Sequence, residues 1–174
     1  MISIISSTNR IDSRTSRVAT FYKELLDSKG VESQIIDLSL LPPDFAFTAL
    51  YHNQGKNELF NEFAKKVNES EKFVFIVPEY NGSFPGILKT FIDGMEYPAG
   101  FKNKKCALLG ISSGTQGSAL ALSHLTDIFN YMNMYVLPSK PRLAKLDAVF
   151  QNGKITDAFL ADLVETQVRD LIKF

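Results

Sequence analysis

The segment from Ser6 to Ser16 is rich in hydroxyl groups and also carries two arginines, Arg10 and Arg14. It follows the apolar run Ile2–Ile5 and precedes a helical pattern that begins at Thr15. Free backbone N–H groups and a partial positive charge at a helix start attract anions. An arginine can hold a phosphate through two parallel hydrogen bonds. This segment therefore predicts a site for a terminal phosphate monoester.

The same segment lacks two well-known nucleotide-binding patterns. It has no Gly-Lys-Ser/Thr, which disfavours a P-loop nucleoside triphosphatase, and no G-x-G-x-x-G, which disfavours a dinucleotide bound as in the Rossmann fold. Its composition alone is equally compatible with a simple capped helix start that exposes its charges to solvent.

A second unusual segment, Pro78–Gly86, contains two prolines and two glycines directly after the most apolar run of the chain. Asn81-Gly82 is a turn pair, and its backbone N–H groups could donate to a planar heterocycle approached closely by Gly82. Tyr80 offers an aromatic face. We expect Ser83 to cap the helix that follows, whose positive end would favour a reduced, anionic flavin ring. The alternative is a tight turn with a capping serine.

A third segment, Ser112–Ser118, combines hydroxyl groups with Gly114 and Gly117. Glycines allow a ligand to approach the backbone closely. A glycine-rich entry into the next helix would explain the same composition.

The sequence Pro78-Glu79-Tyr80-Asn81-Gly82-Ser83-Phe84-Pro85-Gly86 resembles the P-x-Y-N-x-S-x-P-G signature of the NAD(P)H-dependent FMN reductase family. That family has a flavodoxin-like fold and includes quinone, azo-dye and chromate reductases. The first segment resembles the family pattern G-S-x-R-x-x-S-x-N, except that Ser7 replaces the glycine and Thr15 the asparagine. The resemblance covers roughly residues 1–137.

The resemblance implies an enzyme that binds FMN non-covalently and uses NADH or NADPH as co-substrate. It would pass electrons to a small acceptor: a quinone, an azo compound, a metal oxyanion or a flavin. No side chain is expected to act as catalytic acid or base, and Glu79 is expected to shape its loop mainly through its backbone. The expected FMN contacts are Thr8, Arg10, Ser13 and Thr15 for the phosphate, Pro78, Glu79, Tyr80, Asn81, Gly82 and Ser83 for the ring, and Ser113, Gly114 and Gln116 beside the pyrimidine.

Strand-like and helix-like segments alternate along the chain and would position these loops. This order predicts an α/β fold: a flavodoxin-like, doubly wound, five-stranded parallel sheet between two helical layers, with ligands at the carboxyl ends of its strands. The segment 41–54 reads as a loop. The predicted strands are 2–5, 31–38, 73–77, 106–111 and 134–137, and the predicted helices are 15–28, 57–70, 85–95, 118–132 and 156–172.

Length and composition limit the remaining classes of protein. The chain has 174 residues and 45% hydrophobic content, which predicts one domain over residues 1–174. Its 19 basic and 19 acidic residues argue against a nucleic-acid binder and against a polybasic membrane-surface protein. One cysteine and two histidines disfavour a metal site. No long apolar run and no secretory signal are visible, so we expect a soluble, cytoplasmic protein.

Two other functions share this fold. A flavodoxin-type electron carrier would dock on protein partners, but such carriers are usually strongly acidic. A phospho-receiver domain needs acidic residues after the first and third strands, where only Glu79 is near. The family resemblance also implies a homodimer or homotetramer. Phe84, Phe91 and Phe129 could serve that contact or belong to the core, and the acceptor and the preferred nicotinamide stay open.

Overall fold

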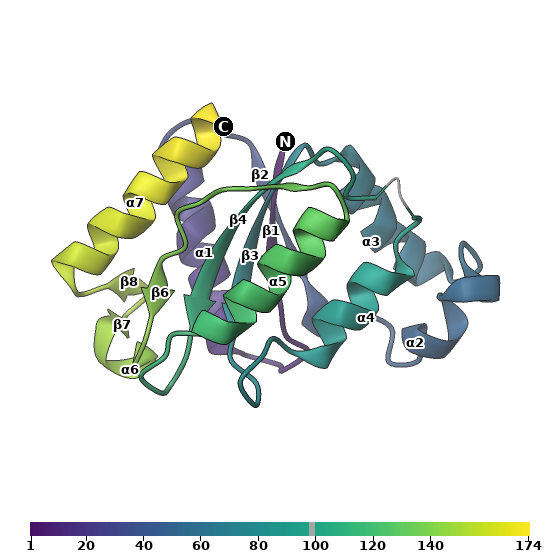
Figure 1. Ribbon diagram of the computed structural model, residues 1–174, viewed down its shortest axis with the longest axis horizontal. Helices are drawn as coiled ribbons and strands as arrows, with labels where there is room; N and C mark the ends of the chain where they lie inside the picture. The colour runs from purple at the N-terminus through teal and green to yellow at the C-terminus, as the bar shows by residue number, and fades with distance from the viewer. Residues whose placement is uncertain (98–99) are drawn as a thin grey trace.

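The computed structural model describes residues 1–97 and 100–174. Its central sheet has the strand order β2-β1-β3-β4-β5, and all neighbouring strands in this order are parallel (Figure 1). This is the flavodoxin-like order, and it confirms the predicted fold class. The chain adds β2 on one side of β1 and then β3, β4 and β5 on the other side. A crevice for a ligand is expected between β1 and β3, where the order of strands switches sides. The strands are β1 Ile2–Ser6, β2 Ser33–Asp37, β3 Lys72–Pro78, β4 Lys105–Ile111, β5 Tyr135–Val136 and β6 Arg142–Leu143.

Helices cover both faces of this sheet (Figure 1). On one face, α1 (Arg14–Asp27) and α7 (Ala158–Lys173) bury a largely aliphatic cluster. On the other face, α3 (Glu58–Glu69), α4 (Gly86–Gly94) and α5 (Ala119–Tyr131) bury a cluster rich in phenylalanine. The predicted arrangement of a sheet between two helical layers is therefore confirmed, and it arises because each helix buries only one apolar stripe.

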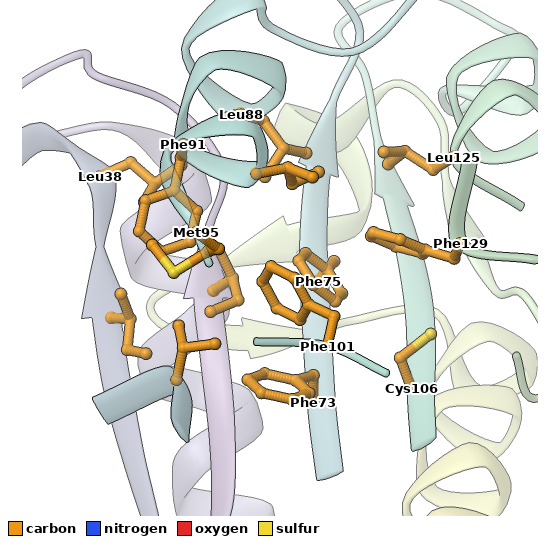
Figure 2. Packing of buried hydrophobic residues seen from close by; sticks show 14 of the residues in the cluster. Leu38, Phe73, Phe75, Leu88, Phe91, Met95, Phe101, Cys106, Leu125 and Phe129 are labelled. Atoms are coloured by element: carbon orange, nitrogen blue, oxygen red, sulfur yellow. The ribbon is translucent and has the colours of Figure 1, made fainter. Parts of the chain in front are cut away.

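Strand β3 lies at the centre of the sheet and is buried on both sides. Phe73 and Phe75 point into the phenylalanine-rich cluster, and Val74 and Ile76 point into the aliphatic one. Figure 2 shows Phe75 beside Phe129 of α5, with the two ring centroids 4.6 Å apart. The continuous apolar run in the sequence is therefore the two-sided strand that it predicted.

The fifth strand position differs from the prediction because it is split. β5 pairs with the start of β4, and β6 pairs with its end. Pro138 and Pro141 interrupt the ladder between them, since proline has no N–H to donate. The buried side chain of Gln167 fills the gap: its Nε2 donates to the carbonyl oxygens of Leu108 and Ser139, both at 2.9 Å.

Several short elements were not predicted. The segment expected to be a loop over residues 41–54 contains α2, in which Phe45 is buried and stacks on Phe60 of α3 at 5.3 Å. Elements of two to four residues carry no readable periodicity, and tertiary packing decides them. The additional elements are η1 Leu38–Leu40, α2 Phe45–Thr48, η2 Tyr51–Asn53, α6 Leu146–Val149, β7 Phe150–Gln151 and β8 Lys154–Ile155.

Candidate functional site

A cavity of about 400 Å³ lies at the carboxyl ends of β1, β3 and β4, and we call it the loop cavity. All three loops that the sequence singled out contribute to its wall. Its volume falls within the about 300–1,000 Å³ that is typical of cofactor pockets. The loop cavity is lined by Thr8, Arg10, Ile11, Asp12, Ser13, Arg14, Thr15, Pro78, Glu79, Tyr80, Ile111, Ser112, Ser113 and Leu146.

The first wall is the loop between β1 and α1. Ser13 is the N-cap of α1, and its Oγ accepts a hydrogen bond from the N–H of Ser16 at 3.0 Å. The capped helix start suggested by composition is therefore present, and the same loop also faces a cavity. Since the Ser13 hydroxyl accepts with a lone pair, its own hydrogen can still be donated to a ligand.

The second wall is a tight hairpin from Tyr80 to Ser83. The Tyr80 N–H donates to the Ser83 carbonyl at 2.7 Å, and the Ser83 N–H donates back at 3.0 Å. Asn81 and Gly82 have φ angles of 51° and 74°, as a type I′ turn requires. The predicted turn pair is confirmed, while Asn81, Gly82 and Ser83 lie outside the lining of the loop cavity.

The prediction that Ser83 caps α4 is wrong. Pro85 occupies the N-cap position of α4, and no side chain accepts a hydrogen bond there. Because Ser83 closes the hairpin with Tyr80, its side chain reaches α5 instead, where its Oγ hydrogen-bonds Nδ1 of His124 at 2.9 Å. The hairpin is therefore tied to α5.

Glu79 shapes the site through its side chain as well as its backbone, which the sequence analysis did not anticipate. Its Oε2 accepts from the N–H of Ser118 at 3.1 Å, directly before α5. Its own N–H donates to the carbonyl of Ile111 at 3.2 Å. Glu79 therefore joins the loop after β3 to the loop after β4.

Arg14 is a lining residue that the sequence analysis did not select. Its Nη1 donates to Ser113 Oγ at 2.9 Å, and its Nη2 lies 2.7 Å from a carboxylate oxygen of Asp147 in α6. The arginine content of the first loop was a signal for it. Leu146 carried no such signal, because only the tertiary structure brings α6 to the cavity.

The loop after β4 depends on a close backbone approach at Gly110. A Cβ atom at this position would lie only 2.2 Å from the carbonyl oxygen of Gly117. Of the three predicted contacts on this loop, Ser113 lines the loop cavity, whereas Gly114 and Gln116 do not.

Within residues 1–97 and 100–174, no group of three or more histidine, cysteine, aspartate or glutamate side chains is placed to hold a metal ion. No helix in these ranges has the length and apolar character needed to cross a membrane.

Comparisons with known proteins place the chain in a family. Residues 1–145 match the family model described as NADPH-dependent FMN reductase. A 2-hydroxy-1,4-benzoquinone reductase from Burkholderia sp. is 31% identical over 67% of this chain and 72% of that protein. An FMN-dependent NADPH-azoreductase of Staphylococcus aureus is 29% identical over 91% of this chain and 84% of that protein.

Solved structures agree on the fold. The flavoenzyme FerB, an NAD(P)H:(acceptor) oxidoreductase from Paracoccus denitrificans, superposes with a TM-score of 0.80 at 22% identity, covering 99% of this chain and 94% of FerB. The family match spans all three loops of the loop cavity, so the resemblance seen in the motifs is confirmed. The chain belongs to the NADPH-dependent FMN reductase family of flavodoxin-like oxidoreductases.

Proposed function

We propose that the loop cavity holds FMN non-covalently and that the protein passes electrons from NADH or NADPH to a small acceptor. The observation that carries this proposal is the meeting of the hydroxyl-rich helix start, the proline-flanked hairpin and the loop after β4 around one cavity. Bound FMN would supply the hydride and electron chemistry, and the protein would supply binding and orientation.

The phosphate end of FMN fits the wall made by the first loop. Thr8, Ser13 and Thr15, which carry hydroxyl groups, line the loop cavity together with Arg10 and Arg14. Hydroxyl hydrogens and guanidinium groups are donors suited to a phosphate dianion. The amino end of the 14-residue helix α1 adds its partial positive charge at the same place.

The ring end of FMN fits the opposite wall. Pro78, Ile111 and Leu146 give this wall an apolar component, and the hairpin after β3 provides backbone groups held in a rigid turn. A flavin ring needs both, because it has a flat apolar benzenoid part and a polar pyrimidine edge. We propose Glu79, Tyr80, Asn81, Gly82 and Ser83 as the residues that shape this wall.

Titration with FMN tests the proposal. The purified protein should take up FMN, quench its fluorescence and then oxidise NADH or NADPH when a quinone, an azo dye, a metal oxyanion or free flavin is supplied. Comparing both nicotinamides against this acceptor panel would identify the donor and the acceptor. A protein that takes up no FMN, and leaves the nicotinamide unoxidised, would overturn the proposal.

The alternative of a flavodoxin-type electron carrier has less support. The 19 basic and 19 acidic residues give no net charge to steer the protein onto a charged partner. Rapid oxidation of NADH or NADPH with a small acceptor, in the absence of any partner protein, separates the enzyme from the carrier.

We further propose a homodimer or homotetramer that forms through a surface groove between α4 and α5, the α4–α5 groove. Tyr51, Tyr97 and Tyr131 line this groove with 79%, 71% and 78% of their surfaces exposed. Exposed tyrosines are typical of interface centres. Phe91 and Phe129, the other suggested contacts, are fully buried in the core, and Phe84 packs against it.

Sedimentation velocity at several protein concentrations tests this assembly. A species of twice or four times the monomer mass is expected, and a monomer at all concentrations would contradict it. We also propose a cytoplasmic location for the protein.

A further inference from the structure

A single side chain connects the two ends of the proposed FMN site. The hydroxyl of Tyr80, in the loop after β3, lies 2.6 Å from Oγ1 of Thr8, in the loop after β1. These residues are 72 positions apart in the sequence. Thr8 is only 1% exposed, so the contact is made against a well-packed part of the first loop.

Arg10 packs against the same tyrosine. The Cζ atom of its guanidinium group lies 4.9 Å from the centre of the Tyr80 ring, and its backbone N–H donates to Thr8 Oγ1 at 3.3 Å. A guanidinium group over an aromatic face is attracted by the ring and keeps a preferred orientation. Tyr80 therefore contacts both the hydroxyl and the guanidinium group that the proposed function assigns to the phosphate.

Tyr80 is itself held in place from the other side. Its backbone pairs with Ser83 in the hairpin, Ser83 is hydrogen-bonded to His124 of α5, and the neighbouring Glu79 accepts from the N–H of Ser118. The tyrosine thus stands on a turn anchored to α5 and reaches across the site to the phosphate wall. A group held in its bound geometry loses less conformational freedom when a ligand arrives.

We infer that Tyr80 is a positioning residue that orients Thr8 and Arg10 for the phosphate monoester, so that it sets the preference for FMN over riboflavin. This inference rests on the proposed FMN site and goes beyond it, because it gives a ring-loop residue a role in phosphate selection. Riboflavin has the same ring without the phosphate, so the ratio of the two dissociation constants isolates the phosphate contribution.

The experiment measures the dissociation constants of FMN and riboflavin by flavin fluorescence for the unaltered protein, Tyr80→Phe and Thr8→Val. Tyr80→Phe removes the tyrosine hydroxyl that is hydrogen-bonded to Thr8 and keeps the aromatic ring against which Arg10 packs. We expect it to weaken FMN binding about three- to tenfold, as for the loss of one hydrogen bond, and to leave riboflavin binding unchanged. Tyr135→Phe, an exposed tyrosine outside both the loop cavity and the α4–α5 groove, is the matched control.

The double variant Thr8→Val/Tyr80→Phe tests whether the tyrosine acts through the threonine. If it does, adding Tyr80→Phe to Thr8→Val should change the FMN-to-riboflavin ratio much less than it does in the unaltered protein. Equal weakening of FMN and riboflavin by Tyr80→Phe would overturn the inference, since it would indicate a contact with the ring. An unchanged ratio would overturn it too.

These outcomes can be told apart from a failure of the proposed function. If the unaltered protein binds neither flavin, both the function and the inference are wrong. If it prefers FMN strongly and Tyr80→Phe keeps that preference, the FMN site stands and only the role of Tyr80 is wrong. Far-ultraviolet circular dichroism and a denaturant titration of each variant verify that the fold is retained.

Discussion

Two cavities in this molecule have walls of opposite character. The loop cavity, of about 400 Å³, is made by loops at the carboxyl ends of three strands and is lined mainly by residues that carry hydroxyl, guanidinium or carboxylate groups. The α4–α5 groove, of about 560 Å³, is made by helix surfaces and lined by Tyr51, Lys89, Ile92, Asp93, Met95, Glu96, Tyr97, Asp127, Ile128, Tyr131 and Met132.

This contrast indicates that the loop cavity and the α4–α5 groove have different functions. Loops at strand ends bring together polar groups that are distant in sequence, which suits an ionised small molecule. Side chains on packed helices form a broad and mainly apolar surface, which suits another protein surface. The α4–α5 groove is therefore not the better candidate for the FMN site, although it is larger, because the described residues of its wall include no arginine, serine or threonine to hold a phosphate.

The largest effect on FMN binding is expected from removing a side chain of the loop cavity that we assign to the FMN phosphate. Arg10→Ala should weaken FMN binding about 10- to 150-fold, because a hydrogen bond to a charged group contributes about 1.5–3 kcal/mol. Riboflavin binding should stay nearly the same, and fluorescence titration measures both. Arg17→Ala, which removes an exposed arginine of α1 outside the cavity, should leave FMN binding unaltered. Equal FMN affinities for the two variants would mean that Arg10 does not contact the phosphate.

A second prediction concerns the backbone that supports the loop cavity. Gly110→Ala places a methyl group against the carbonyl oxygen of Gly117, so it should lower the free energy of unfolding by about 1–3 kcal/mol. Urea titration measures the change. Gly86→Ala is the matched control: a Cβ there meets nothing within 4 Å, and alanine suits a helix better than glycine. Equal stability of Gly110→Ala and the unaltered protein would show that the loop yields at little cost.

The third prediction tests the α4–α5 groove. Tyr131→Glu adds a charge to an exposed tyrosine of the groove and should weaken self-association at least about tenfold, without changing FMN binding. Analytical ultracentrifugation is the measurement. Phe159→Glu, on α7 at the opposite face of the sheet, should leave assembly unchanged. If Phe159→Glu alone dissociates the protein, the interface lies on the α7 face.

The last prediction concerns the thiol of Cys106, which lies in the buried core. Burial raises the pKa of the Cys106 thiol from its ordinary value of 9.0 to about 12, so the folded protein keeps the thiol protonated at a pH where the unfolded chain loses the proton. This contribution to stability is complete below pH 9 and is lost as the pH rises from 9 to 12. The stability of Cys106→Ala should therefore fall less steeply over that range.

Thiol labelling gives an independent measurement on the same residue. Native protein at pH 8 should react with a thiol reagent only as fast as it unfolds, since Cys106 is fully buried. Immediate labelling of the native protein would contradict the buried position.

Much of the architecture could be predicted because its signals are local. The apolar run of β3 and the hydroxyl-rich segment after β1 each lie within one short stretch of chain. The Asn81-Gly82 pair likewise carries the conformational preference of its own turn. Alternating strands and helices then restrict the topology to a few arrangements.

The partners of individual side chains could not be read in the same way. Ser83 has the composition of a helix cap, yet the hairpin turns it toward His124. Leu146 reaches the loop cavity only because α6 folds back beside the first loop, where Asp147 pairs with Arg14. Short elements such as α6 have no periodicity of their own, so contacts far apart in sequence decide them.

The order of the elements, the family and the three loops around the site could all be predicted from local signals, because propensity and motif are properties of neighbouring residues. The set of loop residues that line the cavity and the contact between Tyr80 and Thr8 had to be seen in the folded chain, because they depend on how the twisted sheet and its helices bring distant segments together.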